Sequence, residues 1–188
     1  PEAVDLIRAS IPATVEIVYE IDPDVRPVLA DPTQIQQIVM NLCINALHAM
    51  GDEGGELRIE LSEREIGCAN EAADDSLPHG AYAQLSVRDT GHGMTREIAG
   101  RVFEPYFTTK EQGKGTGLGL SVVHGIVKSS GGDVSIGSEP GKGTVVSVLL
   151  PVIEGADETP EQKTESAPLP GGTERIMIVD DEETIVEF

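Results

Sequence analysis

The strongest structural signal in the chain is an amphipathic helix between Asp31 and Gly51. Asp31 is a favourable N-cap, Pro32 suits the first helical position, and Gly51 suits the position after the last turn. The apolar residues inside these limits recur at helical spacing, at positions 35, 38, 39, 42, 46, 49 and 50. A helix with one such apolar face requires a second layer of structure to cover that face.

Segments with a period of two residues provide the second layer. Alternation of apolar and polar residues, as in 15–21, is typical of a strand with one buried face. The sequence predicts, in chain order, strand 15–21, helix 31–50, strands 56–66 and 82–88, a short helix from Thr95, a loop over 104–115, helix 116–130 and strands 133–138 and 144–150. Helices mixed with mostly antiparallel strands indicate a two-layer α/β sandwich.

Composition narrows the class of protein. Tryptophan is absent and aromatic residues make up 3% of the 188 residues, so we expect an aliphatic core. The formal net charge of −20 disfavours binding to nucleic acid or to an anionic membrane. No apolar run approaches the ~20 residues of a membrane span, and no signal-peptide pattern opens the chain. With Cys43 and Cys68 as the two cysteines, a reducing cytoplasm is the expected location.

The last part of the chain differs from the rest. Residues 151–188 include 11 acidic and two basic residues, and 154–172 is rich in Pro, Glu, Thr and Gly. This composition cannot bury enough apolar surface to fold by itself, so we interpret it as a linker. The apolar run 175–179 and the acidic residues Asp180 and Asp181 follow the linker, and a plain acidic tail is the alternative interpretation.

A polar stripe runs along the predicted helix beside its apolar face. Gln37, Asn41 and Asn45 are spaced four residues apart and His48 continues the line, so these side chains share one face. Asparagine is a mediocre helix former, because its amide competes for backbone hydrogen bonds. Its neutral oxygen is a suitable ligand for Mg²⁺ beside phosphates, and a solvated helix face is the alternative interpretation.

Glycine-rich segments with polar neighbours suggest ligand-binding loops. Asp89 ends a predicted strand and is followed by Gly91 and Gly93, which suits a carboxylate that accepts an adenine amine, or an ordinary turn. Glycines at 113, 115, 117 and 119 precede a predicted helix, and Lys110 and Lys114 add positive charge. Bare backbone N–H groups at a helix N-terminus favour an anion site, and a flexible hinge is the alternative.

Together these segments resemble the ATP-binding catalytic domain of sensor histidine kinases. The motifs are, in order, Asn41-Leu42 with Asn45-Ala46, Asp89-x-Gly91-x-Gly93, Phe103-Glu104-Pro105-Tyr106-Phe107-Thr108-Thr109-Lys110, Gly115-x-Gly117-Leu118-Gly119-Leu120 and Gly141-x-Gly143-Thr144. They correspond to the N, G1, F, G2 and G3 boxes of that family, and the resemblance extends over residues 14–151. It implies the Bergerat fold, an α+β two-layer sandwich in which helices cover one face of a mixed sheet, with ATP as the ligand.

The residue roles of the family carry over position by position. The resemblance implies that Asn41 and Asn45 hold Mg²⁺ and phosphate oxygens, and that Asp89 takes the adenine amine. It also implies a mobile lid over 104–115. The further residues with implied ATP-binding or lid-anchoring roles are His48, Gly91, Gly93, Phe103, Phe107, Lys110, Gly115, Thr116, Gly117, Leu118, Gly119 and Thr144.

One position departs from the family pattern. Gln37 stands where relatives often carry a glutamate, and the related gyrase-type and chaperone-type ATPases use that glutamate to activate water. Glutamine cannot act as a general base, so we expect weak hydrolysis and favour a kinase over an ATPase. Gln37 and Asn41 are the expected catalytic positions. The alternatives are a degenerate module that only binds nucleotide and a GHKL-type ATPase.

A histidine kinase also needs a phosphoacceptor histidine on a dimerising helical hairpin. The four histidines, at 48, 79, 92 and 124, lie inside the catalytic segment, so we expect the acceptor outside this chain. Residues 1–13 would then end the connection from that hairpin, 14–151 form the catalytic domain and 152–173 the linker. Residues 174–188 resemble the first strand and acidic pair of a receiver domain, which predicts a hybrid histidine kinase as the parent protein.

Overall fold

The computed structural model describes residues 11–12, 14–67, 77–110 and 115–153 of the chain. The chain divides into two units, Pro1–Ala156 and Asp157–Phe188, and the second lies entirely outside the described residues. Three predicted segments also lie wholly or mostly outside the described residues: the receiver segment 174–188, the linker 152–173 and the N-terminal connection 1–13. Within the described ranges, no helix has both the length and the apolar character needed to cross a bilayer.

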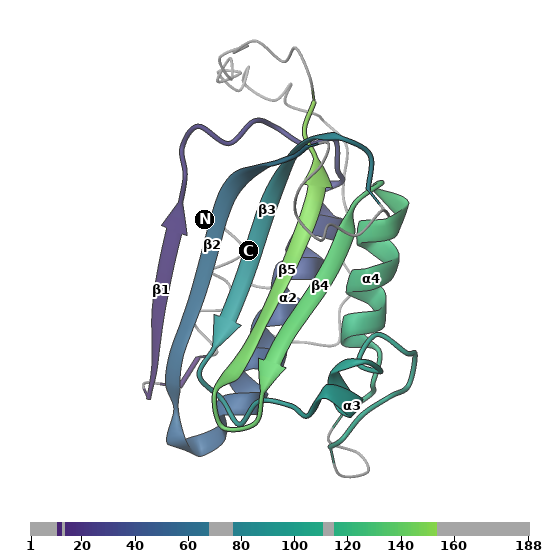
Figure 1. Ribbon diagram of the computed structural model, residues 1–188. Helices are drawn as coiled ribbons and strands as arrows, with labels where there is room; N and C mark the ends of the chain where they lie inside the picture. The colour runs from purple at the N-terminus through teal and green to yellow at the C-terminus, as the bar shows by residue number, and fades with distance from the viewer. Residues whose placement is uncertain (1–10, 13, 68–76, 111–114, 154–188) are drawn as a thin grey trace, which may run out of the picture. The chain divides into compact units, whose positions relative to one another are not determined.

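Five strands form one mixed sheet (Figure 1). In chain order they are β1 (Val15–Ile21), β2 (Gly55–Ile66), β3 (Gly80–Asp89), β4 (Asp133–Glu139) and β5 (Gly143–Pro151). Their order across the sheet is β1-β2-β3-β5-β4, with β1 parallel to β2 and the other neighbours antiparallel. The predicted strands and the mixed, mostly antiparallel sheet are therefore confirmed.

Helix α2 (Pro32–Met50) has the predicted limits at both ends. The Asp31 side chain accepts a hydrogen bond from the Thr33 backbone N–H at 2.8 Å, and Pro32 occupies the first turn. Gly51 caps the other end with φ 57°, a conformation that favours glycine, and begins the 3₁₀ helix η1 (Gly51–Glu53). Local capping residues therefore define this helix.

Two shorter helices follow β3. Helix α3 (Arg96–Ala99) begins where predicted, whereas α4 (Gly119–Ser129) starts three residues later than the predicted 116–130. The first predicted residues are not helical, because Gly117 has a left-handed φ of 65° and its carbonyl accepts a hydrogen bond from the Tyr106 N–H at 3.0 Å. The backbone before α4 is therefore bound to the preceding loop instead of to the helix.

The core lies between the sheet and helices α2 and α4, which cover the same face of the sheet (Figure 1). Its largest fully buried side chains are aliphatic apart from one thiol: Ile38, Leu57, Val123, Val127, Val148 and Cys43. Burial raises the pKa of the Cys43 thiol to about 12, so this residue is an unreactive packing group. The predicted aliphatic core and two-layer sandwich are both confirmed.

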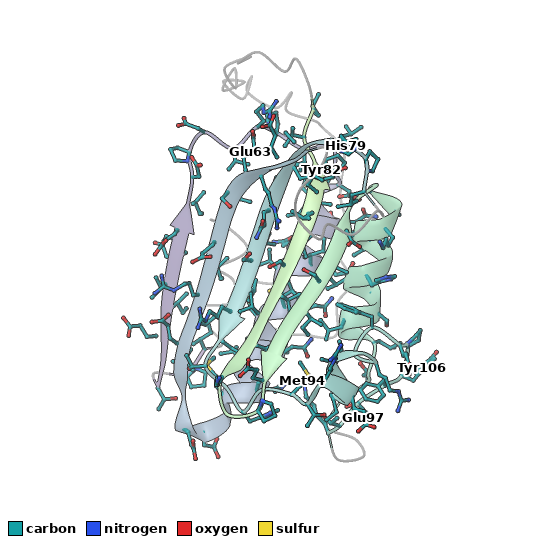
Figure 2. The ribbon with its side chains drawn as sticks, in the orientation of Figure 1. Glu63, His79, Tyr82, Met94, Glu97 and Tyr106 are labelled. Atoms are coloured by element: carbon teal, nitrogen blue, oxygen red, sulfur yellow. The ribbon has the colours of Figure 1, made fainter. Side chains whose placement is uncertain are left out.

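The motifs identified in the sequence gather at one end of the sheet. Figure 2 shows Met94, Glu97 and Tyr106 at this end and Glu63 and Tyr82 at the opposite end. Strands β3 and β4 finish at this end of the sheet, β5 begins there, and α4 starts on the same side of the molecule (Figure 1). The ends of β3 and β4 and the starts of β5 and α4 therefore lie together at one end of the sheet.

Candidate functional site

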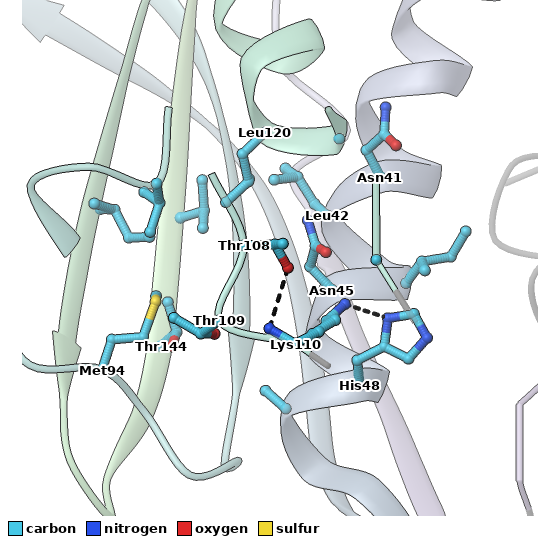
Figure 3. Close-up of a pocket in the computed structure, with 18 of the residues that line it drawn as sticks. Asn41, Leu42, Asn45, His48, Met94, Thr108, Thr109, Lys110, Leu120 and Thr144 are labelled. Carbon is cyan, nitrogen blue, oxygen red and sulfur yellow. Dashed lines mark hydrogen bonds between the residues drawn. The ribbon is translucent and has the colours of Figure 1, made fainter. Parts of the chain in front are cut away.

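A cavity of about 650 Å³ opens at this end of the sheet, between α2, the loop after α3 and the start of α4 (Figure 3). The predicted site residues that line it are Asn41, Asn45, His48, Asp89, Lys110, Gly115, Thr116, Gly117, Gly119 and Thr144. Gln37, Gly91, Gly93 and Leu118 are not part of its lining. Motifs that are far apart in the sequence therefore meet in one cavity.

Asp89 is a buried acidic group in the cavity wall, at the last position of β3. The residue is 5% exposed, and its Oδ1 accepts a hydrogen bond from the Gly91 N–H at 2.8 Å. Burial raises the pKa of this carboxyl, and hydrogen bonds from the backbone N–H groups of Gly91 and Thr144 act against that shift. A carboxylate has about four acceptor positions, so Asp89 can also accept a hydrogen bond from a ligand amine.

A hydroxyl network lies beside Asp89 on the neighbouring strands. Thr144 is the register partner of Asp89 between β3 and β5, and it is 7% exposed. Its Oγ1 lies 3.0 Å from Ser138 Oγ on β4, and Ser138 Oγ also accepts a hydrogen bond from the Met94 N–H at 2.8 Å. These contacts join two strands and the loop after β3, so the sheet itself holds this end of the cavity.

Gly91 and Gly93 lie where the loop after β3 packs closely against other parts of the chain. A Cβ on Gly91 would lie 2.5 Å from the Ala49 carbonyl, and a Cβ on Gly93 would lie 1.9 Å from the Glu139 carbonyl oxygen. Between the two glycines, the His92 N–H donates a hydrogen bond to the Ala49 carbonyl at 3.0 Å. The glycines therefore let this loop pass between α2 and the β4–β5 turn.

The asparagines of α2 face the start of α4. Asn41 and Asn45 are half-buried, and a Cβ on Gly119 would lie 3.2 Å from Asn41 Oδ1 and 3.5 Å from Asn45 Nδ2. Two amides and the N-terminus of α4 thus share one side of the cavity, which suits phosphate oxygens and a hard cation. Gln37, one turn earlier on α2, is exposed to solvent.

Lys110 and His48 form a hydrogen-bonded pair on the same side of the cavity (Figure 3). The Lys110 ammonium donates to His48 Nδ1 at 2.7 Å. Burial lowers the pKa of Lys110, and burial together with the Lys110 charge lowers the pKa of His48. Among the described residues that line the cavity, Lys110 is the only lysine or arginine. It therefore concentrates positive charge at one end of a cavity whose other end holds Asp89.

Aromatic contacts hold the loop that follows α3 and borders the cavity. Phe103 packs against the core, and its ring centroid lies 5.6 Å from that of His124 on α4. Phe107 lines the cavity, and the Arg101 guanidinium carbon lies 4.4 Å from its ring centroid. Tyr106 lies between the two phenylalanines and is 77% exposed. These contacts agree with the lid-anchoring role that the family resemblance implies for Phe103 and Phe107.

Sequence reasoning missed most of the apolar cavity wall. Its members include Met94, Ile98, Val102, Ile136 and Val146. Their apolar character predicts burial, but no local pattern distinguishes a core residue from one that borders a cavity. Thr108 and Thr109 also line the cavity, and their place in the Phe103–Lys110 motif was a usable signal.

The cavity is partly apolar, with a buried carboxylate at one end and amides, a helix N-terminus and a lysine at the other. In an α+β fold, such a cavity is typical of a nucleotide-binding domain. Residues 30–154 match the family described as "Histidine kinase-, DNA gyrase B-, and HSP90-like ATPase". The chain belongs to this family, and the matched domain is the catalytic ATPase part of histidine protein kinases.

The curated relatives carry the names of kinases. The chain is 39% identical over 189 residues to Sensor kinase CckA of Brucella abortus (strain 2308), covering 96% of this chain and 20% of the relative. It is 33% identical over 158 residues to Sporulation kinase E of Bacillus subtilis (strain 168), covering 84% of this chain and 19% of the relative. The chain thus spans about one fifth of the length of these relatives.

Solved structures share the fold. The full-length ShkA structure in complex with AMPPNP matches with a TM-score of 0.62 at 26% identity, covering 80% of this chain and 28% of that one. The nucleotide-free catalytic domain of histidine kinase ThkA matches with a TM-score of 0.61 at 28% identity, covering 80% and 88% of the two chains. These likenesses confirm the predicted Bergerat α+β fold.

Proposed function

We propose that this chain binds ATP together with Mg²⁺ and donates the γ-phosphoryl group to a histidine on a separate dimerisation domain. The observation that carries the proposal is the polarity of the cavity, with Asp89 at one end and Asn41, Asn45 and Lys110 at the other. ATP has the matching order of groups, because its base donates a hydrogen bond and its triphosphate is anionic. Membership of the histidine kinase-like ATPase family supports the same ligand.

Asp89 is the proposed recognition group for adenine. Its carboxylate would accept a hydrogen bond from the 6-amino group, where guanine has a carbonyl oxygen instead. A carbonyl placed against a buried carboxylate leaves two acceptors unpaired, so ATP should bind more tightly than GTP. The Thr144 hydroxyl, 3.0 Å from Ser138 Oγ, lies beside this position and lines the cavity, so its oxygen could accept a hydrogen bond from a water molecule that contacts the base.

Asn41 and Asn45 are the proposed protein ligands of Mg²⁺. Among the described residues, no group of three or more His, Cys, Asp or Glu is placed to hold a metal ion. The donor set fits Mg²⁺ that is held mainly by phosphate oxygens and water, because neutral amides add no negative charge beside a triphosphate. When bound, Mg²⁺ would neutralise charge on the phosphates during transfer. The N–H groups near Gly117 and Gly119, with Thr116 and Lys110, would hold the remaining phosphate oxygens.

The lack of a general base at Gln37 favours transfer over hydrolysis. An attacking imidazole is already a nucleophile and needs mainly to be positioned, whereas a water molecule needs a base. Gln37 is a glutamine, is exposed and does not line the cavity, so nothing at this position would deprotonate water. The chain alone should therefore release phosphate from ATP slowly.

The partners of the module follow from the same reasoning. The phosphoacceptor histidine is proposed to belong to a dimerisation domain that precedes residue 14 in the parent protein. Because ATP is the proposed phosphoryl donor, the module is proposed to work in the cytoplasm. Residues 174–188 are proposed to begin a receiver domain after the 152–173 linker. The alignment with Sensor kinase CckA covers 96% of the chain, so it extends beyond the catalytic segment into at least part of this terminal segment, which supports a common domain order.

Calorimetric titration of the chain with ATP and Mg²⁺, with GTP as the control, tests the binding half of the proposal. We expect ATP to bind and GTP to bind at least tenfold more weakly, the effect of about 1.4 kcal/mol. Equal affinities would show that Asp89 does not select the base, and no binding of either nucleotide would overturn the proposed function.

Radiolabelled ATP tests the transfer half. The chain should yield phosphohistidine only when a separately produced dimerisation domain with its histidine is added. A nucleotide-binding chain that never labels any dimerisation domain would indicate the degenerate module. Multi-turnover phosphate release by the chain alone would indicate an ATPase and contradict the role given to Gln37.

A further inference from the structure

Lys110 is held at three points, one on its backbone and two on its side chain. Its backbone N–H donates to Thr108 Oγ1 at 3.1 Å. Its stem packs on the bare backbone of Gly115, where a Cβ would lie 3.0 Å from Lys110 Cδ. Its ammonium donates to His48 Nδ1 at 2.7 Å (Figure 3). A long flexible side chain held in this way keeps its charge in one place.

The contact with Lys110 determines the protonation state and the tautomer of His48. An ammonium group has three donors and no acceptor, so the shared hydrogen belongs to Lys110 and Nδ1 supplies a lone pair. The imidazole must then be neutral with its proton on Nε2. A neutral ring adds no charge to the cavity, and its nitrogen facing Lys110 is already occupied.

We propose that His48 is a positioning residue, which holds the Lys110 ammonium where the polyphosphate of the nucleotide binds and does not itself contact phosphate. This inference rests on the proposed function, and it differs from a direct ATP-binding role, which the family resemblance implies for His48. Lys110 comes from the lid loop and His48 from α2, 62 residues away, so the pair also joins the lid to the rigid helix. Lys110 thus supplies the charge that binds phosphate, and His48 holds that charge in position.

A double-mutant cycle tests this division of roles. ATP and adenosine affinities are measured by calorimetry for wild type, His48→Ala, Lys110→Met and the double variant. We expect His48→Ala to weaken ATP about three- to tenfold, the scale of such couplings, and to leave adenosine unchanged. In the Lys110→Met background the same change should have no further effect on ATP, because the group that His48 positions has been removed.

A conservative variant separates positioning from folding. In His48→Asn, the amide oxygen of the new side chain can replace the imidazole Nδ1, since both atoms are attached to Cγ, so this variant should keep most of the ATP affinity. His79→Ala and Lys142→Met, exposed and outside the cavity lining, are matched controls and should bind ATP as wild type does. Additive losses in the cycle, or no rescue by His48→Asn, would overturn the positioning role.

A measurement without nucleotide keeps this inference distinct from the proposed function. In ¹⁵N-histidine NMR spectra of the nucleotide-free chain near pH 7, His48 should show an unprotonated Nδ1 and a protonated Nε2, and Lys110→Met should shift the Nδ1 resonance. A protonated Nδ1, or one that ignores Lys110→Met, overturns the contact and the inference. A wild-type chain that shows the expected spectra but binds no ATP would overturn the proposed function and, with it, the role of the pair.

Discussion

The two ends of the cavity are built in different ways. At the end proposed to bind adenine (the base end), Asp89 and Thr144 are 5% and 7% exposed, lie on paired strands and are held by backbone and hydroxyl hydrogen bonds. At the end proposed to bind the triphosphate (the phosphate end), Lys110 belongs to a loop, and its side chain contacts two residues, His48 and Gly115. The base end is therefore part of the folded sheet, whereas the positive charge of the phosphate end depends on one loop side chain and its contacts.

This difference predicts how each end responds to change. Substitutions at the base end should alter the stability of the whole domain or the affinity for any adenine compound. Substitutions at the phosphate end should leave the fold intact and alter the affinity for ATP but not for adenosine. Adenosine is thus the ligand that distinguishes the two ends.

The largest expected effect is on stability, from Gly93→Ala. Gly93 has φ 65°, and an added Cβ would lie 1.9 Å from the Glu139 carbonyl oxygen, a backbone atom that cannot move aside. We expect the free energy of unfolding to fall by about 3 kcal/mol or more. Gly141→Ala is the matched control, because Gly141 has φ 76° but nothing within 4 Å of the added atom, so it should lose only about 1 kcal/mol. Urea unfolding of both variants measures the difference, and equal losses would show that close packing does not constrain the base end.

The second effect is on affinity, from Asp89→Asn. The asparagine offers one acceptor oxygen instead of two and carries no charge, so the hydrogen bond to the adenine amine should weaken by about 1–3 kcal/mol. ATP and adenosine should lose the same factor, because both contain the base. Calorimetry with the two ligands checks this expectation, and a loss confined to ATP would place Asp89 at the wrong end of the nucleotide.

A smaller effect is expected from Asn41→Ala at the phosphate end. Removal of one amide ligand should lower the ATP affinity in Mg²⁺ about tenfold, which corresponds to about 1.4 kcal/mol. In EDTA, the variant and wild type should bind ATP alike, and the preference for ATP over GTP should persist. If Mg²⁺ dependence and affinity are both unchanged, the polar stripe of α2 is a solvated helix face.

Local sequence signals predicted the elements and the position of the site. The limits of α2 depend on Asp31 and Gly51, whose effects reach only one helical turn, so they are visible in the sequence. The order of the motifs predicts ATP-binding roles for Asp89 and Asn41. Both residues line the cavity, and their chemical roles stay predictions.

Contacts between distant segments were not predictable. The close approaches of Gly91 to Ala49 and of Gly93 to Glu139 depend on how the loop after β3 fits between α2 and a hairpin turn. The late start of α4 depends on a hydrogen bond from Tyr106, which belongs to another segment of the chain. The pairing of Lys110 with His48 likewise appears only when the loop meets the helix. In each case the partner is remote in sequence and follows no periodic pattern.

The smallest expected effect concerns the pH dependence of stability and tests whether the base end opposes folding. Burial raises the pKa of Asp89 above its unfolded value, so the folded state binds this proton more tightly than the unfolded state does. Asp89 therefore makes the protein less stable as the pH rises from about 4, its ordinary pKa, through the raised value. Asparagine does not titrate, so the unfolding free energy of Asp89→Asn minus that of wild type should increase between pH 4 and pH 7 in urea titrations without nucleotide.

Glu97→Gln, which removes an exposed carboxylate on α3, is the control for the loss of one negative charge from an acidic protein. A larger rise for Asp89→Asn than for Glu97→Gln would show that the buried carboxylate is kept at a cost in stability, as expected for a group that serves binding. A flat or falling difference would mean that the N–H groups of Gly91 and Thr144 outweigh burial. The base end would then be stable without its ligand, and its contrast with the phosphate end would lie in rigidity alone.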